Sequence, residues 1–577
     1  MGIKTNRQQN LVQGSIILAM ATMLVKVLGM IYKIPLNNIF DGLGAGYYST
    51  AYDLYLPVYS LAMAGLPVAV SRMVAESVAR KEYKNTRKIL KIAQRAFLVT
   101  GTVGTGAIIL LTYFYLYNEP FRKIFNISAD TDNVYSIVLI SFSVLFCCIM
   151  SSYRGYYEGL RNMYPTAVSQ VMEAMGKLVI GLALAAGTKY FCVESLNMTE
   201  AESMPFVSGA AILGVTIGSA VGAIYLIIRH ARTSDGITEQ QLAESPDADT
   251  SKFLLKSLIA IAIPVVIGSL VRDVAALVDL TTVKARLGGV VGANPNLVKD
   301  VFGINIEYTS TEDIVTYLYG CYKGYAYSIY NLVPTITAVI GVSAIPILCT
   351  AWTSANKQEI KLSIGSIIKL TSVIALPAGI GITVLSGPIL NLLYSSRPDE
   401  VIISTPVLQM LGVSAIFSAM AVPTTSMLQA IGKQKVPVIN MAVGVVLKIV
   451  VNYVLVGIPA INVIGAPVGT GVCYLYIMVA NLAVLRKHSG VKLHLVSNMF
   501  KPLVCALMCG ITAYFSYGLM LTLCGSEKLS SAICIVLAAV VYLVCLGFSK
   551  TFTKNDIMML PKGEKLVKIL AKIGWIG

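Results

Sequence analysis

Charged side chains are scarce in this chain of 577 residues, of which only 13% are charged and 56% are hydrophobic. A soluble globular domain carries roughly 25% charged residues, so the composition excludes an ordinary soluble protein. Apolar runs of roughly 18 or more residues recur along the whole sequence, and each is long enough to cross a bilayer as a helix. The runs are continuous rather than alternating, which argues against a membrane β-barrel. We therefore predict an all-α polytopic membrane protein.

The usual sequence signs of an enzyme are also missing. There is no GxxxxGK[ST] phosphate-binding loop, which excludes a P-loop ATPase. The three histidines lie in or beside polar loops, and most of the eleven cysteines lie inside apolar runs, so no pair has the spacing of a metal site. We expect no cofactor and no catalytic chemistry. A proton gradient, a sodium gradient or the membrane potential would supply any energy that transport requires.

The apolar runs predict about fourteen spans and no cleavable signal peptide. The spans cover residues 12–36, 47–78, 89–117, 132–156, 163–188, 205–229, 252–285, 314–352, 362–394, 402–430, 436–457, 463–485, 499–523 and 529–549.

Positive charge is concentrated in alternate loops between these spans. The net charge of +16 is therefore not a sign of nucleic-acid binding, because it is confined to short connections. One set of loops is rich in lysine and arginine, as at Arg80, Lys81 and Lys84, whereas the alternate set holds few, such as Lys189 and Arg397. The positive-inside rule places the rich loops and both termini in the cytoplasm.

A polar, acidic stretch, TSDGITEQQLAESPDADT, separates the first six spans from the last eight. We predict an N-terminal six-helix lobe at 1–232, a cytoplasmic linker at 233–250 and a second six-helix lobe at 251–487. Residues 488–577 would form two additional helices and a basic amphipathic tail on the inner membrane surface. The sequence of the longest exterior loop, 288–311, does not indicate its function.

Short matches in the same order indicate an internal repeat of six spans. The stretch AYDLYLPVYSLAMAGLP matches AYSIYNLVPTITAVIGVSAIP, with Tyr52 opposite Tyr327 and Tyr55 opposite Tyr330. The connection GLRNMYPTA likewise matches AIGKQKVPVI. Both copies enter from the cytoplasm, so the repeat is parallel, and two parallel lobes are an architecture of transporters with the substrate path between them. Prolines in the second and eighth spans would bend these helices.

Several spans carry charged residues, each of which costs roughly 2.5–3.5 kcal/mol at the bilayer centre. The fifth span holds Glu173 and Lys177 at the spacing of a favourable i,i+4 pair. At mid-depth, cations outnumber acids by two, which favours an anionic head group in a central cavity. Structural ion pairs and snorkelling lysines are the alternatives for each residue alone. The candidate substrate-binding residues are Lys26, Lys33, Asp53, Glu173, Lys177, Arg272, Asp273, Asp279, Lys323 and Lys448.

Three stretches resemble a known family: KVLGMIYKIPLNNIF, AYDLYLPVYSLAMAGLPVAVSRMVAE and YRGYYEGLRNMYPTAVSQVMEAMGKL. They are similar to polysaccharide-biosynthesis transporters of the SpoVB/YtgP type, relatives of the MurJ lipid II flippases in the superfamily that also contains the MATE drug exporters. The resemblance implies a V of two six-helix lobes plus two C-terminal helices in the bacterial cytoplasmic membrane. It also implies transport of an undecaprenyl-diphosphate-linked saccharide, such as lipid II, to the outer leaflet.

The same resemblance places the family's first-span basic position on Lys26. Gram-negative relatives carry an acidic–basic pair in the eighth span, where this chain has Tyr327 and Ser328 and its nearest base is Lys323. The set of cations is therefore expected to differ. The expected partners are the lipid-linked saccharide diphosphate and membrane lipids, with a monomeric protein that works beside cell-wall synthesis enzymes.

Two other functions remain open from the sequence. A multidrug or cation antiporter of the same superfamily would need a net acidic cavity, which the surplus of positive charge disfavours. A membrane glycan polymerase or ligase would need a large exterior domain or an exterior cluster of acidic residues and histidines, and the outside loops are short.

The membrane topology is testable with single cysteines in a background that lacks the native exposed ones. A cysteine at Asn85 or Gln434 should react with an impermeant thiol reagent only from the cytoplasm, because both positions lie in lysine- and arginine-rich connections. A cysteine at Asn296 or Ser526 should react only from outside. Labelling of any of these from the opposite side would contradict the fourteen-span topology.

Overall fold

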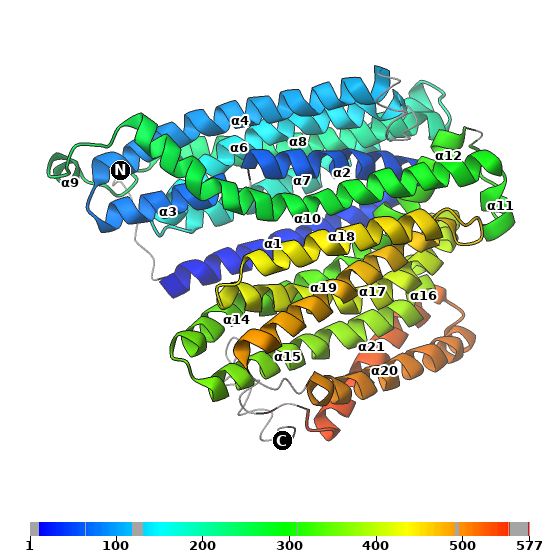
Figure 1. Cartoon of the computed structure of the whole chain (residues 1–577). Helices are drawn as coiled ribbons and strands as arrows, with labels where there is room; N and C mark the ends of the chain where they lie inside the picture. Colours follow the sequence, from blue (N-terminus) through cyan, green and yellow to red (C-terminus); the bar gives the residue numbers. More distant parts are fainter. Residues whose placement is uncertain are drawn as a thin grey trace. The chain divides into compact units, whose positions relative to one another are not determined.

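The computed structural model describes residues 11–63, 65–117, 131–308, 310–490, 495–551, 553 and 575. Every regular element in these ranges is a helix (Figure 1). Twelve of the helices described are long and apolar enough to cross a membrane. Two other long helices are α1 (Leu11–Ile39) and α10 (Ser251–Ala293). The all-α polytopic prediction is confirmed, and these elements correspond to the spans expected from the sequence.

The chain forms two compact units. The first comprises Met1–Thr281 with Glu312–Gly320, and the second comprises Thr282–Thr311 with Cys321–Gly577. The chain passes from the first unit to the second inside α10, returns after the first residue of α12 and leaves again at the end of α12. The lobe limits at 232, 250 and 487, which rest on loop charge and on the repeat, remain a prediction. The amphipathic tail predicted from Pro561 lies outside the described residues, except for Trp575.

In the first unit, α2, α4, α6, α7 and α8 lie side by side, and α1 packs on α7 (Figure 1). The unit contains α1, α2 (Gly42–Met63), α3 (Leu66–Ala79), α4 (Tyr83–Tyr117), η1 (Thr131–Asn133), α6 (Val134–Gly159), α7 (Tyr164–Tyr190), η2 (Phe191–Ser195), α8 (Glu200–Arg232), α9 (Glu239–Ala243), the first part of α10 and most of α12 (Thr311–Gly320).

In the second unit, α17 packs on α14, α15 and α19, while α20 packs on α15 and α21. Its elements are α11 (Leu297–Phe302), η3 (Cys321–Ala326), α13 (Tyr327–Tyr330), α14 (Leu332–Thr353), α15 (Lys357–Val384), α16 (Ser386–Tyr394), α17 (Pro398–Ala430), α18 (Lys435–Leu455), η4 (Asn462–Ile464), α19 (Gly465–Ser489), α20 (Leu495–Cys524) and α21 (Glu527–Phe548).

The second predicted span is divided into two helices. Helix α2 ends at Met63 and α3 begins at Leu66, with Pro67 in its first turn. Proline suits this position because the amide hydrogen that it lacks would have had no partner within the helix. Gly65 lies at the break, where an added Cβ would come within 2.2 Å of the Ala262 carbonyl oxygen on α10. The break therefore allows the first part of α10 to pack closely against the junction of α2 and α3.

Glycines bring α7 and α8 into backbone contact. Gly214, Gly218 and Gly222 of α8 follow the small-xxx-small spacing that lets membrane helices approach closely. A Cβ on Gly214 would lie 2.2 Å from the Gly181 Cα. A Cβ on Gly218 would lie 2.8 Å from the Glu173 carbonyl oxygen and 2.8 Å from the Lys177 amide nitrogen. This contact fixes the part of α7 that carries the candidate site.

Gly214→Ala should destabilise the protein because its methyl group has no room against the α7 backbone. Forcing extra volume into a packed site typically costs about 1–3 kcal/mol. Gly187→Ala is the matched control on α7, because nothing lies within 4 Å of its added Cβ, and the change should preserve or raise stability. Thermal unfolding of the detergent-purified proteins measures both. Equal melting temperatures for the two variants would contradict the close α7–α8 contact.

Candidate functional site

Two lysines lie over tyrosine rings inside the first unit. Lys177 Nζ on α7 donates to the Tyr52 hydroxyl on α2 at 2.6 Å, and lies 5.0 Å from the Tyr52 ring centroid and 5.3 Å from that of Tyr32 on α1. Lys33 Nζ lies 5.3 Å from the ring centroid of Tyr48. Such cation–π contacts stabilise an ammonium by about 0.5–2 kcal/mol. We call these five residues the lysine–tyrosine cluster.

One hydroxyl of this cluster, that of Tyr48, makes no hydrogen bond of 3.5 Å or less to a described residue, and its polar neighbours are the hydroxyls of Tyr32 and Tyr52. Tyr48 is 3% exposed, and its hydroxyl oxygen is buried without a hydrogen bond. Its ring stacks on Tyr52 with centroids 4.9 Å apart. Buried hydroxyls are normally hydrogen-bonded, so an unpartnered one beside two ammonium groups is suited to bind an anionic ligand.

The cluster continues as a tyrosine ladder along one face of α2. Tyr48, Tyr52, Tyr55 and Tyr59 follow one another at spacings of four, three and four residues, which is the repeat of one helix face. Ring centroids are 6.1 Å apart for Tyr52–Tyr55 and 5.1 Å for Tyr55–Tyr59. In the sequence, Tyr52 and Tyr55 indicate only the alignment of the repeat. The spacing of the four tyrosines along the sequence was the signal that would have identified the ladder.

The predicted ion pair between Glu173 and Lys177 does not form. Glu173 Oε2 instead accepts from Arg154 Nη2 of α6 at 2.9 Å, while Lys177 bonds to Tyr52. The Arg154 Nε also donates to Ser169 Oγ at 2.9 Å. The prediction was wrong because i,i+4 spacing puts two side chains on one face without deciding which neighbour each one meets. Arg154 was absent from the sequence-based candidates.

Two candidate carboxylates hold helices of the first unit together. The Tyr319 hydroxyl on α12 donates to Asp53 Oδ2 on α2 at 2.5 Å in a buried contact. Gly320 packs so closely here that an added Cβ would lie 1.8 Å from the Gly42 carbonyl oxygen. The Ser60 hydroxyl on α2 donates to Asp273 on α10. Both acids therefore have a structural role between helices.

Lys323 provides a similar contact in the second unit. It is 7% exposed, and its Nζ lies 4.6 Å from the ring centroid of Tyr327 and 5.5 Å from that of Tyr322. It sits in the π-helical segment η3, a local feature that is frequent at functional sites. The Ser404 hydroxyl donates to the Cys321 carbonyl oxygen at 3.0 Å and so satisfies a backbone group of this segment.

The remaining candidates are Lys26, Lys448, Asp279 and Arg272. Lys26 is exposed on α1. Lys448 on α18 and Asp279 on α10 are buried, at 5% and 1% exposure. The side chain of Arg272 lies outside the described part of the structure. The substrate-binding role of all ten candidates therefore stays a prediction, with Lys33 and Lys177 placed in the most suitable surroundings.

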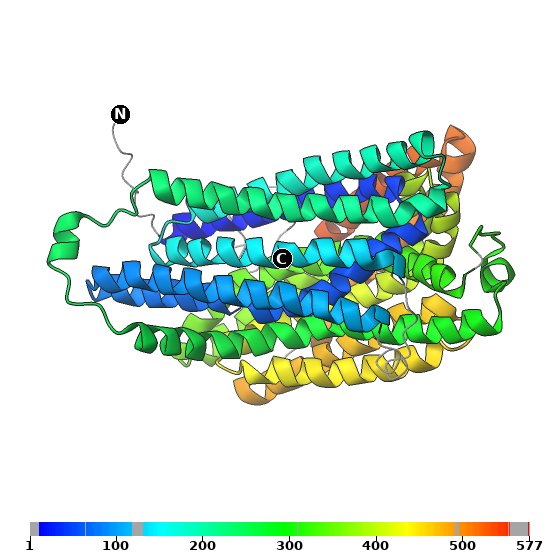
Figure 2. The same cartoon turned by 90° about the horizontal axis from the view of Figure 1, so that it is seen from above.

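The linker at 233–250 is docked against one end of the first unit, where α9 lies (Figures 1 and 2). Arg87 donates from Nε and Nη2 to the two oxygens of Asp235 at 3.0 and 3.2 Å. The Tyr156 hydroxyl also donates to Asp235, at 3.0 Å. Asn85 and Asp249 exchange two hydrogen bonds at 2.8 and 2.9 Å. Asn85 is consequently buried, so Gln434 is the accessible one of the two positions predicted to be cytoplasmic.

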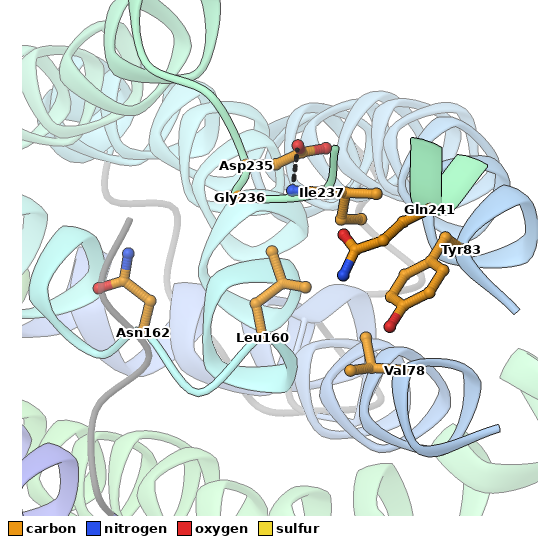
Figure 3. Close-up of a pocket in the computed structure, with 8 residues that line it drawn as sticks. All are labelled: Val78, Tyr83, Leu160, Asn162, Asp235, Gly236, Ile237 and Gln241. Atoms are coloured by element: carbon orange, nitrogen blue, oxygen red, sulfur yellow. Dashed lines mark hydrogen bonds between the residues drawn. The ribbon is translucent and has the colours of Figure 1, made fainter. Parts of the chain in front are cut away.

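A small pocket lies beneath this segment (Figure 3), where the Ile237 amide donates to Asp235 Oδ1 at 3.1 Å. Its cavity volume of about 60 Å³ is suited to a few water molecules and is too small for a lipid head group. It is lined by Val78, Tyr83, Leu160, Asn162, Asp235, Gly236, Ile237 and Gln241. We therefore assign it to the docking of the linker.

Asp235 links this docking to pH. Partial burial raises its pKa, but the bonds from Arg87, the Ile237 amide and Tyr156 outweigh burial and hold the pKa below its ordinary value. A lowered folded-state pKa stabilises the folded form above the unfolded pKa of about 3.9, and the gain is lost as the pH falls through the folded value. The docking is therefore fully stabilised at neutral pH.

The helices and the polar cluster among them define a polytopic membrane protein with a cationic, tyrosine-rich site inside its first unit. The chain belongs to the polysaccharide biosynthesis protein family, whose profile matches residues 11–352. The family described as lipid II flippase MurJ matches residues 318–551.

Relatives and solved structures agree with this membership. The lipid II flippase MurJ of Bacillus subtilis (strain 168) is 24% identical over 557 residues, covering 93% of this chain and 96% of the relative. The stage V sporulation protein B of the same strain is 20% identical over 568 residues, covering 97% and 99%.

Two solved structures share the fold. The lipid II flippase MurJ in an inward closed conformation has a TM-score of 0.63 at 14% identity, covering 92% of this chain and 98% of that structure. An inward-facing multidrug resistance MATE family transporter has a TM-score of 0.59 at 14% identity, covering 81% and 98%.

The Tyr319–Asp53 contact should stabilise the first unit measurably. Hydrogen bonds to charged groups contribute about 1.5–3 kcal/mol, so Tyr319→Phe should lower the free energy of unfolding by about that amount. Asp53→Asn should weaken the same bond, and the double variant should lose less than the sum of the two single changes. Chemical denaturation of the purified proteins gives the coupling free energy. Strictly additive losses would show that the contact contributes nothing.

Proposed function

We propose that the protein is a flippase that moves an undecaprenyl-diphosphate-linked saccharide, such as lipid II or a related polysaccharide precursor, across the bacterial cytoplasmic membrane. The observation that carries the proposal is the lysine–tyrosine cluster. It offers two ammonium groups and the buried, unpartnered hydroxyl of Tyr48. Family membership and the named activity of the MurJ relative support the same substrate class.

The chemistry of the cluster suits a diphosphate. Phosphate oxygens accept short, charge-assisted hydrogen bonds from ammonium groups, and these are about twice as strong as neutral ones. Lys177 is held by neutral tyrosines rather than by a carboxylate, so its positive charge is not cancelled by its neighbours. A diphosphate can therefore bind it without first displacing an acid. The lipid tail remains in apolar surroundings, and the ladder of tyrosine rings supplies amphipathic surface beside the head group.

A multidrug or cation antiporter is the second candidate, because a MATE transporter shares the fold. An organic cation would need an available carboxylate, and three candidate acids of the first unit are engaged by other residues. Asp53 accepts from Tyr319, Asp273 from Ser60 and Glu173 from Arg154. The contacts therefore favour the anionic substrate.

The proposal includes alternating access between the two leaflets, with both termini in the cytoplasm. Transport is driven by a proton gradient, a sodium gradient or the membrane potential, since the sequence contains no P-loop for ATP hydrolysis. The protein works as a monomer beside cell-wall synthesis enzymes.

Complementation of a bacterial strain depleted of its own lipid II flippase tests the function. The wild-type chain should restore growth and outer-leaflet lipid II. Lys177→Gln should abolish rescue because it removes the ammonium, and Tyr48→Phe should impair it without lowering stability, since the lost hydroxyl has no protein partner. Lys299→Gln is the control, because it removes a lysine charge from an exposed position on α11.

Membrane levels of each variant are measured in parallel by immunoblot. Failure of the wild-type chain to restore outer-leaflet lipid II would reject lipid II as the substrate. Full rescue by Lys177→Gln and Tyr48→Phe at normal levels would reject the lysine–tyrosine cluster as the binding site.

A further inference from the structure

Arg154 is a further cation inside the first unit, besides Lys33 and Lys177, and the proposed function leaves it without a role. It lies near the end of α6, and its side chain is 14% exposed. Its Nε donates to Ser169 Oγ, and its Nη2 donates to Glu173 Oε2 and contacts the Met150 sulfur at 3.4 Å. Within the described ranges, Nη1 donates to no protein atom. We call Arg154, Ser169 and Glu173 the arginine site.

We propose that the arginine site is a second binding station for the substrate diphosphate, and that Glu173 occupies the guanidinium only while the site is empty. This inference rests on the proposed function. It adds a site that the substrate diphosphate would occupy before it reaches the lysine–tyrosine cluster. Arg154 is the binding group, and Glu173 is an internal competitor for it.

The geometry of the pair permits exchange. Glu173 meets the guanidinium through a single nitrogen rather than through the two parallel bonds of a bidentate arginine–carboxylate pair. Its side chain is 31% exposed, so part of the carboxylate remains accessible. A diphosphate carries more negative charge and more acceptor oxygens than a carboxylate, and it can engage the guanidinium fork bidentately. Glu173 meanwhile prevents the cost of an unpaired, partly buried cation in the empty protein.

The arginine site lies one helical turn from the lysine–tyrosine cluster. Glu173 and Lys177 share one face of α7 and are separated by about 6 Å along the helix axis. Gly218 packs directly against the backbone at both positions, so their spacing is fixed. A diphosphate can therefore pass from Arg154 to Lys177 by moving about one turn along a rigid helix.

The tyrosine ladder connects the two stations on the facing side. Tyr59 at its end interacts electrostatically with both Arg154 and Glu173. From there the ladder leads through Tyr55 to Tyr52, which binds Lys177. Arg154 also lies toward the end of α6 that meets the α6–α7 turn, which the loop charges predict to be cytoplasmic. A head group that enters from that side reaches Arg154 first.

The alternative is that the pair only fastens α6 to α7. If the pair has only this structural role, any change to either partner should lower the stability of the protein and should not strengthen anion binding. A binding station predicts that removal of the competing carboxylate strengthens anion binding. The two interpretations therefore differ in sign for Glu173→Gln.

Equilibrium binding of radiolabelled farnesyl diphosphate to the full-length purified protein tests this. Glu173→Gln should tighten binding several-fold, because the amide is neutral and competes less for the guanidinium. Arg154→Gln should weaken binding about ten- to hundredfold, as expected for the loss of charge-assisted bonds, with Arg154→Lys in between. Lys189→Gln and Glu200→Gln are the controls, since they alter a lysine–glutamate pair at the opposite end of α7 and should leave binding unchanged.

The exchange variant Arg154→Glu with Glu173→Arg separates packing from binding. It should restore the melting temperature lost by Arg154→Gln without restoring farnesyl diphosphate affinity, because the cation then projects from the other helix. Unchanged or weaker binding by Glu173→Gln would overturn the inference and leave the flippase proposal intact. Absence of binding by the wild-type protein, together with failed complementation, would reject both.

Discussion

A cation inside a membrane protein must have a partner, and this requirement shapes the first unit. A charged side chain near the bilayer centre costs roughly 2.5–3.5 kcal/mol on insertion scales when it faces lipid. Here Lys177 and Lys33 lie on tyrosine rings, and Arg154 is held by a serine and a glutamate. Aromatic partners make the lysines tolerable in this environment. The polar site and the packing of α1, α2, α6 and α7 are therefore interdependent.

Close backbone contacts make this arrangement rigid. Gly214 and Gly218 bring α8 against α7, and the second of these glycines touches the backbone of α7 at Glu173. Gly320 brings α12 equally close to α2, beside the buried bond from Tyr319 to Asp53. Glycine interfaces of this kind gain stability from close packing, since water supplies no driving force for association within the bilayer. The side chains of the site consequently project from fixed positions.

The division of roles between acids and bases is consistent with an anionic substrate. Three candidate carboxylates of the first unit, Asp53, Asp273 and Glu173, bind tyrosine, serine or arginine and so connect helices. The lysines instead face aromatic rings, and Lys323 repeats the contact in the second unit on a π-helical segment. A multidrug resistance MATE family transporter shares the fold, so the fold alone does not determine the substrate. The proposal of an anionic substrate therefore rests on the surroundings of the charged groups.

The sequence by itself determined the helical class, the approximate positions of the spans and the presence of charge within them. These features follow from the composition and from the length of apolar runs, which depend on residues adjacent in the chain. It also contained the tyrosine spacing of α2, from which the ladder along one face follows directly.

Only the tertiary structure decided which groups meet. The partner of Glu173 is Arg154 on another helix, and Asp53 is bound by Tyr319, 266 residues away. The division of the second span into α2 and α3 and the π-helical turn around Lys323 were likewise not predictable from hydropathy. Helical periodicity fixes the face on which a side chain lies, whereas its partner depends on the neighbouring helix that packs there and on how closely the glycines allow it to approach.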